Sequence, residues 1–111
     1  MEERPQRIAR NESAYRQVNE AIEAGRETRD ADVPRPFMCE CGLLECNTLV
    51  ELTLGEYEAV RADPHRFFML DGHEIPDVES VVERHERFIV AEKHPESHAI
   101  TEREDPRRDE R

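Results

Sequence analysis

The sequence has no tryptophan, few aromatic side chains and no long apolar run: its aromatic residues are four phenylalanines and two tyrosines. A helix that spans a bilayer needs about 20 mainly apolar residues, and a secretory signal peptide needs a shorter apolar stretch near the N-terminus. Neither pattern is present, so we expect a cytoplasmic protein. With 36% hydrophobic residues among 111, the core can only be small, and an added constraint such as a bound metal would help it fold.

Positive charge is also scarce, because 16 Lys and Arg residues face 27 Asp and Glu residues and the formal net charge is -11. Most of this excess lies between residues 36 and 93. An acidic surface repels nucleic-acid phosphates, and a zinc ion on three thiolates would add a further negative charge there. The composition therefore argues against nucleic acid and membrane as partners and favours a protein partner, with the N-terminal helix as one possible contact.

Cysteine is rare but clustered, since Cys39, Cys41 and Cys46 form the pattern C-x-C-x4-C. In a reducing compartment an odd number of clustered cysteines is typical of metal ligands or reactive thiols rather than of a disulfide framework. On an extended segment Cys39 and Cys41 would point to the same side, with Glu40 on the other. We expect Gly42 to adopt a positive φ that brings Cys46 back toward this pair.

Zinc prefers four tetrahedral ligands, so three cysteines require one more donor. His73 is the best candidate, because it follows Asp71 and Gly72 in a turn after a predicted strand, whereas the other histidines lie in charged segments that we expect to be exposed. The alternatives are a water molecule or one of three carboxylates: Glu40, Glu45 and Glu74. The predicted zinc site is thus Cys39, Cys41, Cys46 and His73, and reduced, metal-free cysteines are the competing interpretation.

Hydrophobic spacing predicts an amphipathic helix over residues 8–24, with an apolar stripe formed by Ile8, Tyr15, Val18 and Ile22. Asn19 lies near this stripe, where an amide could fix the register of a helix pair. The simpler interpretation is that the helix packs on its own domain. Residues 26–36 carry alternating charges and two prolines, which is typical of a linker.

Residues 36–93 combine strand and helix signals. Segments 36–41 and 48–53 suit a hairpin, and Thr53 with Glu56 matches a capping box that starts a helix at Leu54 and stops before Pro64. Segments 66–70, 78–84 and 87–93 suit strands, the last two as a hairpin, with a helical turn as the alternative for residues 78–83. Residues 94–111 are charged and poor in apolar side chains, which predicts a disordered tail.

The predicted fold is therefore α+β: an N-terminal amphipathic helix and linker (1–35), a small antiparallel β domain with one short helix and a zinc knuckle (36–93), and the tail (94–111).

Several of these residues recur together in a recognisable order: Phe37-x-Cys39-x-Cys41, Cys46, Leu52-Thr53-x-x-Glu56-Tyr57-x-x-Val60-Arg61, Pro64, Phe67, Gly72-His73, Val81-Val82 and Val90-x-x-Lys93. Over residues 8–93 this order resembles a group of small, uncharacterised bacterial proteins. The resemblance implies that the helix, the knuckle and the Gly-His pair belong to one unit, and it implies no activity.

For function, a closed shell of three cysteines and one histidine indicates a structural metal, because no coordination position remains for a substrate. The sequence has no glycine-rich phosphate loop and no H-E-x-x-H motif. We therefore expect a non-enzymatic, zinc-stabilised protein-interaction or regulatory module. The alternative is a thiol-based redox switch that releases zinc on oxidation. A hydrolytic zinc site, with Glu40 or Glu74 as the base, ranks third.

Overall fold

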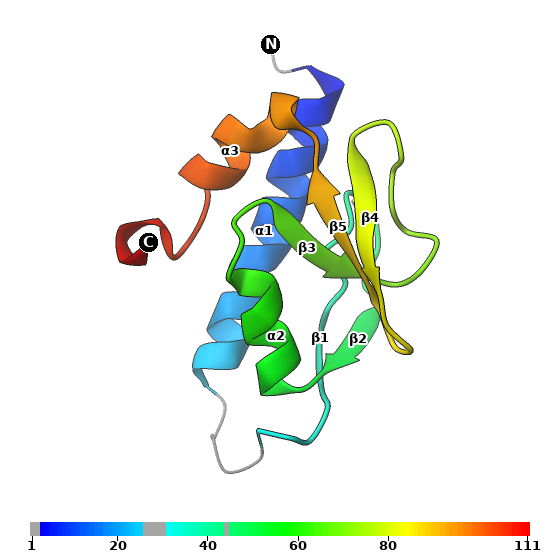
Figure 1. Cartoon of the computed structure of the whole chain (residues 1–111), viewed down its shortest axis with the longest axis vertical. Helices are drawn as coiled ribbons and strands as arrows, with labels where there is room; N and C mark the ends of the chain where they lie inside the picture. The colour runs from blue at the N-terminus through cyan, green and yellow to red at the C-terminus, as the bar shows by residue number, and fades with distance from the viewer. Residues whose placement is uncertain (1–2, 26–30, 44) are drawn as a thin grey trace.

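The computed structural model describes residues 3–25, 31–43 and 45–111 and shows an α+β fold, as predicted (Figure 1). Its elements in chain order are α1 (Arg4–Ala24), β1 (Arg35–Met38), β2 (Leu49–Leu52), α2 (Leu54–Arg61), β3 (Arg66–Met69), β4 (Glu79–Arg84), β5 (Ile89–Lys93), the 3-10 turn η2 (Pro95–Ser97), α3 (His98–Arg103) and the 3-10 turn η3 (Arg108–Glu110). Residues 26–30 of the predicted linker lie outside the described residues.

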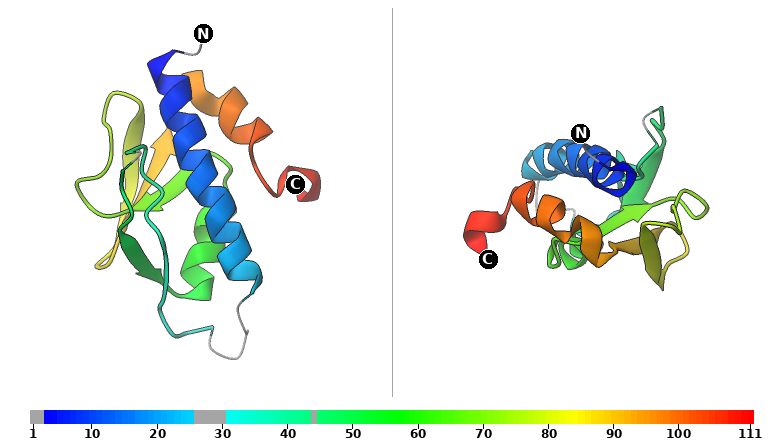
Figure 2. Two further views of the ribbon diagram at one scale, coloured as in Figure 1. Left: turned by 180° about the vertical axis from the view of Figure 1, so that it is seen from behind. Right: turned by 90° about the horizontal axis from the view of Figure 1, so that it is seen from above.

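The strands form two small antiparallel sheets. In the first, β1 pairs with β2 so that Phe37 lies opposite Val50, which confirms the predicted hairpin. In the second, the order is β3-β5-β4, and β5 pairs with both neighbours. Helix α1 runs along one side of both sheets, as the rear and top views show (Figure 2). The cysteine segment thus lies between one hairpin, the other sheet and α1.

The core between these elements is largely aromatic. The rings of Phe37 and Tyr57 stack with centroids 4.6 Å apart, and Phe68 meets both edge-on. Tyr57 faces inward because α2 starts where predicted: Thr53 Oγ1 accepts from the Glu56 amide at 3.1 Å, and Glu56 Oε1 accepts from the Thr53 amide at 2.8 Å. This capping box therefore fixes the helix that supplies one side of the core.

Helix α1 differs from the prediction in the face that it buries. The predicted stripe included Val18, which is 44% exposed, whereas Glu12, Arg16 and Asn19 are buried. Each of these polar side chains has a partner outside the helix: Glu12 lies 2.7 Å from the Lys93 ammonium, and Arg16 donates to a backbone carbonyl beyond α2 and to another in α3. The helix packs on its own domain mainly through polar contacts, which a hydrophobic pattern does not reveal.

The predicted disordered tail (94–111) is also wrong: residues 95–103 form η2 and α3 beside α1 (Figure 1), and Arg107 and η3 follow with further contacts. Ser97, Ile100 and Thr101 are buried there. Only one of these three is strongly apolar, so the order depends on hydrogen bonds such as that from Arg16 to the Thr101 carbonyl at 2.9 Å. Composition underestimates how ordered such a segment is, because it counts apolar side chains and takes no account of hydrogen-bond partners elsewhere in the chain.

Candidate metal centre

The first two cysteines follow β1 directly and are fixed by both sheets. The Cys39 amide donates to the Thr48 carbonyl at 3.0 Å, and the next amide, that of Glu40, donates to the Phe68 carbonyl at 2.9 Å. A turn then returns the chain, because the Cys46 amide donates to the Leu43 carbonyl at 3.0 Å. The three sulfurs therefore meet because backbone hydrogen bonds shape the segment, as the knuckle pattern predicts.

Gly42 helps to shape this segment, but not in the predicted way. Among the described residues only Gly72 is a glycine with a positive φ, so Gly42 does not turn the chain through that region. A Cβ on Gly42 would instead lie 2.5 Å from Cγ2 of Ile8 and 3.3 Å from Cδ1 of Ile75. Glycine is needed here because α1 and the loop before β4 approach the backbone closely.

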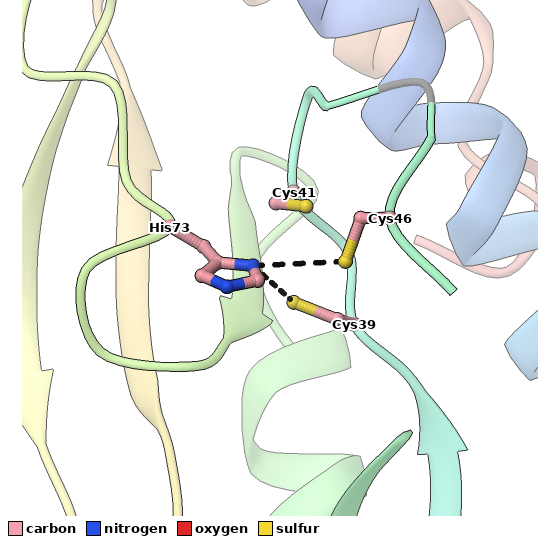
Figure 3. Close-up of side chains that lie close together, drawn as sticks. All are labelled: Cys39, Cys41, Cys46 and His73. Atoms are coloured by element: carbon pink, nitrogen blue, oxygen red, sulfur yellow. Dashed lines mark hydrogen bonds between the residues drawn. The ribbon is translucent and has the colours of Figure 1, made fainter. Parts of the chain in front are cut away.

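Gly72 provides the positive φ that we expected of Gly42, with φ of 96°. It closes the turn after β3, in which the His73 amide donates to the Leu70 carbonyl at 3.0 Å. Glu74 accepts from the Gly72 amide at 2.8 Å and steadies the same turn. This turn aims the His73 ring across at the cysteine segment, as Figure 3 shows.

The four predicted residues converge: one candidate ligand atom from each of Cys39, Cys41, Cys46 and His73 lies within 4.8 Å of all the others. His73 Nδ1 lies 3.5 Å from Cys39 Sγ and 3.6 Å from Cys46 Sγ (Figure 3). Tetrahedral zinc, with Zn–S of about 2.3 Å and Zn–N of about 2.0–2.1 Å, places sulfur and nitrogen about 3.5–3.6 Å apart. These spacings fit a metal ion.

The protonation of the sulfurs also fits a cation. The hydrogen bond with Cys39 lowers the pKa of Cys41 to about 5, and the same bond raises the pKa of Cys39. Cys41 is thus the readier of the two to be a thiolate, and binding a metal displaces the protons of those cysteines that are still thiols. The Leu70 amide donates to Cys39 Sγ at 3.4 Å, an outer contact that stabilises a thiolate ligand.

None of the three competing carboxylates takes part in this cluster. Glu45 is exposed, and Glu74 is engaged by the Gly72 amide. Glu40 points away from the sulfurs, as expected, but into the interior: Arg61 donates to its two oxygens at 2.5 and 2.8 Å, and Asn19 donates at 2.8 Å. His73 is therefore the fourth donor that the geometry offers.

Sequence reasoning missed the supporting role of Asn19 and Arg61. Asn19 also pairs with both backbone groups of Met38, at 2.8 Å each, so α1 holds the strand that leads into the cysteines. The available signal was Asn19 near the expected apolar stripe, which we considered as a possible helix-pairing device. The structure assigns it to the cysteine segment instead.

In the described part of the chain, every helix is too short or too polar to cross a bilayer. Comparisons with protein-family models, with curated proteins and with solved structures give no significant match for this chain. The evidence on function therefore comes from the geometry of the site itself.

Proposed function

We propose that this chain is a non-enzymatic protein-interaction or regulatory module whose fold is stabilised by zinc on Cys39, Cys41, Cys46 and His73. The observation that carries the proposal is the convergence of three sulfurs and one imidazole from segments that are 34 residues apart at the Cys39–His73 contact. Such an ion would join the end of β1 to the turn after β3. In a small fold with little apolar core, that link stabilises the folded state.

Zinc is favoured by the donor set. Calcium and magnesium prefer oxygen ligands, whereas thiolate and imidazole donors in a tetrahedral arrangement are typical of zinc. Four protein donors complete the tetrahedron, so we assign the ion a structural rather than a catalytic role. All three cysteines are free of disulfides, so all three sulfurs are available as ligands.

The interaction surface that we favour is the knuckle and the strand that follows it. Leu43, between the second and third cysteines, is 46% exposed, and Leu49, at the start of β2, is 59% exposed. Zinc would brace the segment that carries both leucines, on a protein whose net charge is -11. A protein partner with an apolar contact inside a basic rim is complementary to it. Helix α1 is less suited, because its own fold uses the face that carries Glu12, Arg16 and Asn19.

Native mass spectrometry of His73→Ala, with His85→Ala as the matched control, tests the metal assignment. His85 is an exposed histidine outside the cluster. Loss of even an outer partner of a metal ligand weakens binding about 10–100-fold, so we expect His73→Ala to lower zinc affinity by at least that factor and His85→Ala to leave it unchanged. Equal zinc content in both variants would contradict the assignment.

Leu43→Asp tests the interaction surface. We expect this variant to keep its zinc and its fold. In a pull-down it should no longer bind the protein partner that the unaltered chain enriches, because a charge would enter the apolar contact. Leu43 is exposed and donates no ligand, so a folding defect is not expected. If Leu43→Asp binds the partner as well as the unaltered chain does, the interaction surface lies elsewhere on the protein.

A thiol-based redox switch is the second candidate, and one observation favours it: Cys46 is only partly buried, whereas Cys39 and Cys41 are buried. Peroxide could oxidise Cys46 and a neighbouring thiolate to a disulfide, with reduction of the peroxide to water and release of zinc. Zinc release measured against peroxide concentration separates the two functions. A switch releases zinc and its partner together at low peroxide, whereas a structural site resists.

A further inference from the structure

A second group of metal-binding side chains lies away from the cysteines. His65 lies between α2 and β3, and His98 and Glu102 lie one turn apart on α3, so they share a helix face. A nitrogen of each ring and a carboxylate oxygen lie within 4.8 Å of one another. These residues come from the segment that sequence analysis treats as disordered and from histidines that it treats as exposed. In the structure both rings are half-buried.

Each ring has one nitrogen held by an outer partner. His98 Nε2 lies 3.0 Å from the Lys93 carbonyl, which can only accept, so this nitrogen carries the proton. His65 Nδ1 lies 2.8 Å from the Thr101 hydroxyl. That hydroxyl donates to the His98 carbonyl at 3.1 Å, so it accepts from His65. Metal-binding histidines are oriented in this way, with the non-ligating N–H donated to a fixed oxygen.

The remaining nitrogens, Nε2 of His65 and Nδ1 of His98, are then lone-pair donors when the rings are neutral. His65 Nε2 lies 3.0 Å from a Glu102 carboxylate oxygen. Two acceptors at this distance repel one another unless a proton or another cation lies between them. A cation between His65 Nε2 and the Glu102 carboxylate, whether a proton or a metal ion, removes this repulsion, and one ligand atom of His98 lies within 4.8 Å of one from each of these two residues.

We propose that His65, His98 and Glu102 form a second divalent-metal site of the zinc class, separate from the thiolate centre. Two imidazoles and one carboxylate are a donor set that first-row divalent metals accept, zinc among them. With three protein ligands, a tetrahedral ion keeps one position for water or an exogenous ligand. The site would also tie α3 to the loop before β3, and so hold the C-terminal segment against the core.

The present arrangement of the rings sets how tightly this site binds. The two imidazoles stack with centroids 3.7 Å apart and planes 15° apart. Imidazole binds a metal in the plane of its ring, so the rings must splay before both nitrogens reach one ion. The Glu102 side chain is 59% exposed, so it can change rotamer as the rings move. This reorganisation makes the second site weaker than the thiolate centre, which has its donors already converging.

The test is a Zn²⁺ titration of the zinc-loaded 111-residue chain, monitored by calorimetry and by the ring signals of the histidines in NMR spectra. We expect a second, weaker Zn²⁺ that shifts the signals of His65 and His98. Glu102→Gln removes the anionic ligand at an exposed position and should weaken this ion at least about tenfold, whereas its fold should persist. His98→Ala, which removes one imidazole ligand, should also weaken binding of the second ion.

Glu83→Gln is the matched control, because Glu83 pairs with exposed His85 at 2.8 Å and no third metal-binding side chain joins them among the described residues. Absence of a second ion, or equal weakening by Glu102→Gln and Glu83→Gln, would overturn the inference. The two proposals can be disproved independently. Loss of the tightly bound ion in His73→Ala tests the proposed function, and loss of the weaker ion in Glu102→Gln tests this second site.

Discussion

At the residue scale, Gly42 shows how closely α1 approaches the cysteine segment. A Cβ there would lie 2.5 Å from Ile8 Cγ2, which is too close for any side chain to be accommodated without movement. We expect Gly42→Ala to lower the free energy of unfolding by about 1–3 kcal/mol, the usual effect of overpacking. Chemical denaturation monitored by circular dichroism measures this directly.

Gly55→Ala is the control for this change, because a Cβ on Gly55 meets only Thr53 Oγ1, at 4.0 Å, within a helix. Replacement of a helical glycine by alanine stabilises by roughly 0.5–1 kcal/mol. Opposite signs for the two variants would support the close approach at Gly42, and a neutral Gly42→Ala would argue against it.

The same residue shows why part of the site could be predicted and part could not. The spacing of Cys39, Cys41 and Cys46 and the Gly72-His73 turn are local patterns, and they led to the four residues that the structure brings together. The need for glycine at position 42 comes from Ile8, which is far away in the sequence. The local sequence around Gly42 suggested a turn. It carries no information about a distant neighbour such as Ile8, so the close approach could not be predicted.

At the element scale, the Glu40–Arg61 pair joins the end of β1 to α2. Both side chains are at most 2% exposed, and Arg61 donates to both oxygens of Glu40. Arg61→Met would leave a buried carboxylate without its counterion, so we expect a loss of about 3–5 kcal/mol in the free energy of unfolding. The measurement is again denaturation, with zinc present throughout.

Arg84→Met tests whether this loss is specific to burial. Arg84 pairs with Asp71 at 3.0 Å, but their side chains are 61% and 71% exposed. Exposed pairs contribute about 0–1 kcal/mol, so this variant should be nearly neutral. Similar losses for the two variants would mean that the Glu40–Arg61 pair does not support the cysteine segment as described.

The elements themselves were largely predictable. The Thr53–Glu56 capping box predicted α2, and β-branched or aromatic runs bounded by turn residues predicted the five strands, each to within a few residues. The buried face of α1 and the order of α3 were not predictable in the same way. Both depend on buried polar groups such as Arg16, whose partners lie in remote segments, and hydrophobic spacing carries no signal for them.

At the scale of the whole molecule, Arg107 links the C-terminal segment to α1 and α2 through hydrogen bonds. It donates to Glu23 at 3.1 Å and to both oxygens of Glu58 at 2.8 Å. A hydrogen bond with Arg107 lowers the pKa of Glu58 to about 2, and a hydrogen bond with Glu58 raises the pKa of Glu23 from 4.5 to about 7. Glu23 therefore keeps a proton in the folded state that it loses in the unfolded state.

The stability from this proton is fully present below pH 4.5 and is lost as the pH rises through about 7. Glu23→Gln retains an uncharged donor at all pH values. We therefore expect the free energy of unfolding of Glu23→Gln, relative to the unaltered chain, to increase as the pH rises across that range. Exposed Glu51 is the control, because Glu51→Gln makes the same charge change at a position away from Glu58 and Arg107. A pH profile of Glu23→Gln that runs parallel to that of Glu51→Gln would contradict the account.

The central claim is that one zinc ion joins three sulfurs and one imidazole nitrogen across two segments of the chain. X-ray absorption at the zinc edge of the purified protein tests it most directly, because it reports the type and distance of the ligands. We predict one tightly bound zinc with three sulfur neighbours at about 2.3 Å and one nitrogen neighbour at about 2.0–2.1 Å. A folded protein without zinc, or a zinc shell of oxygen and nitrogen alone, would contradict it.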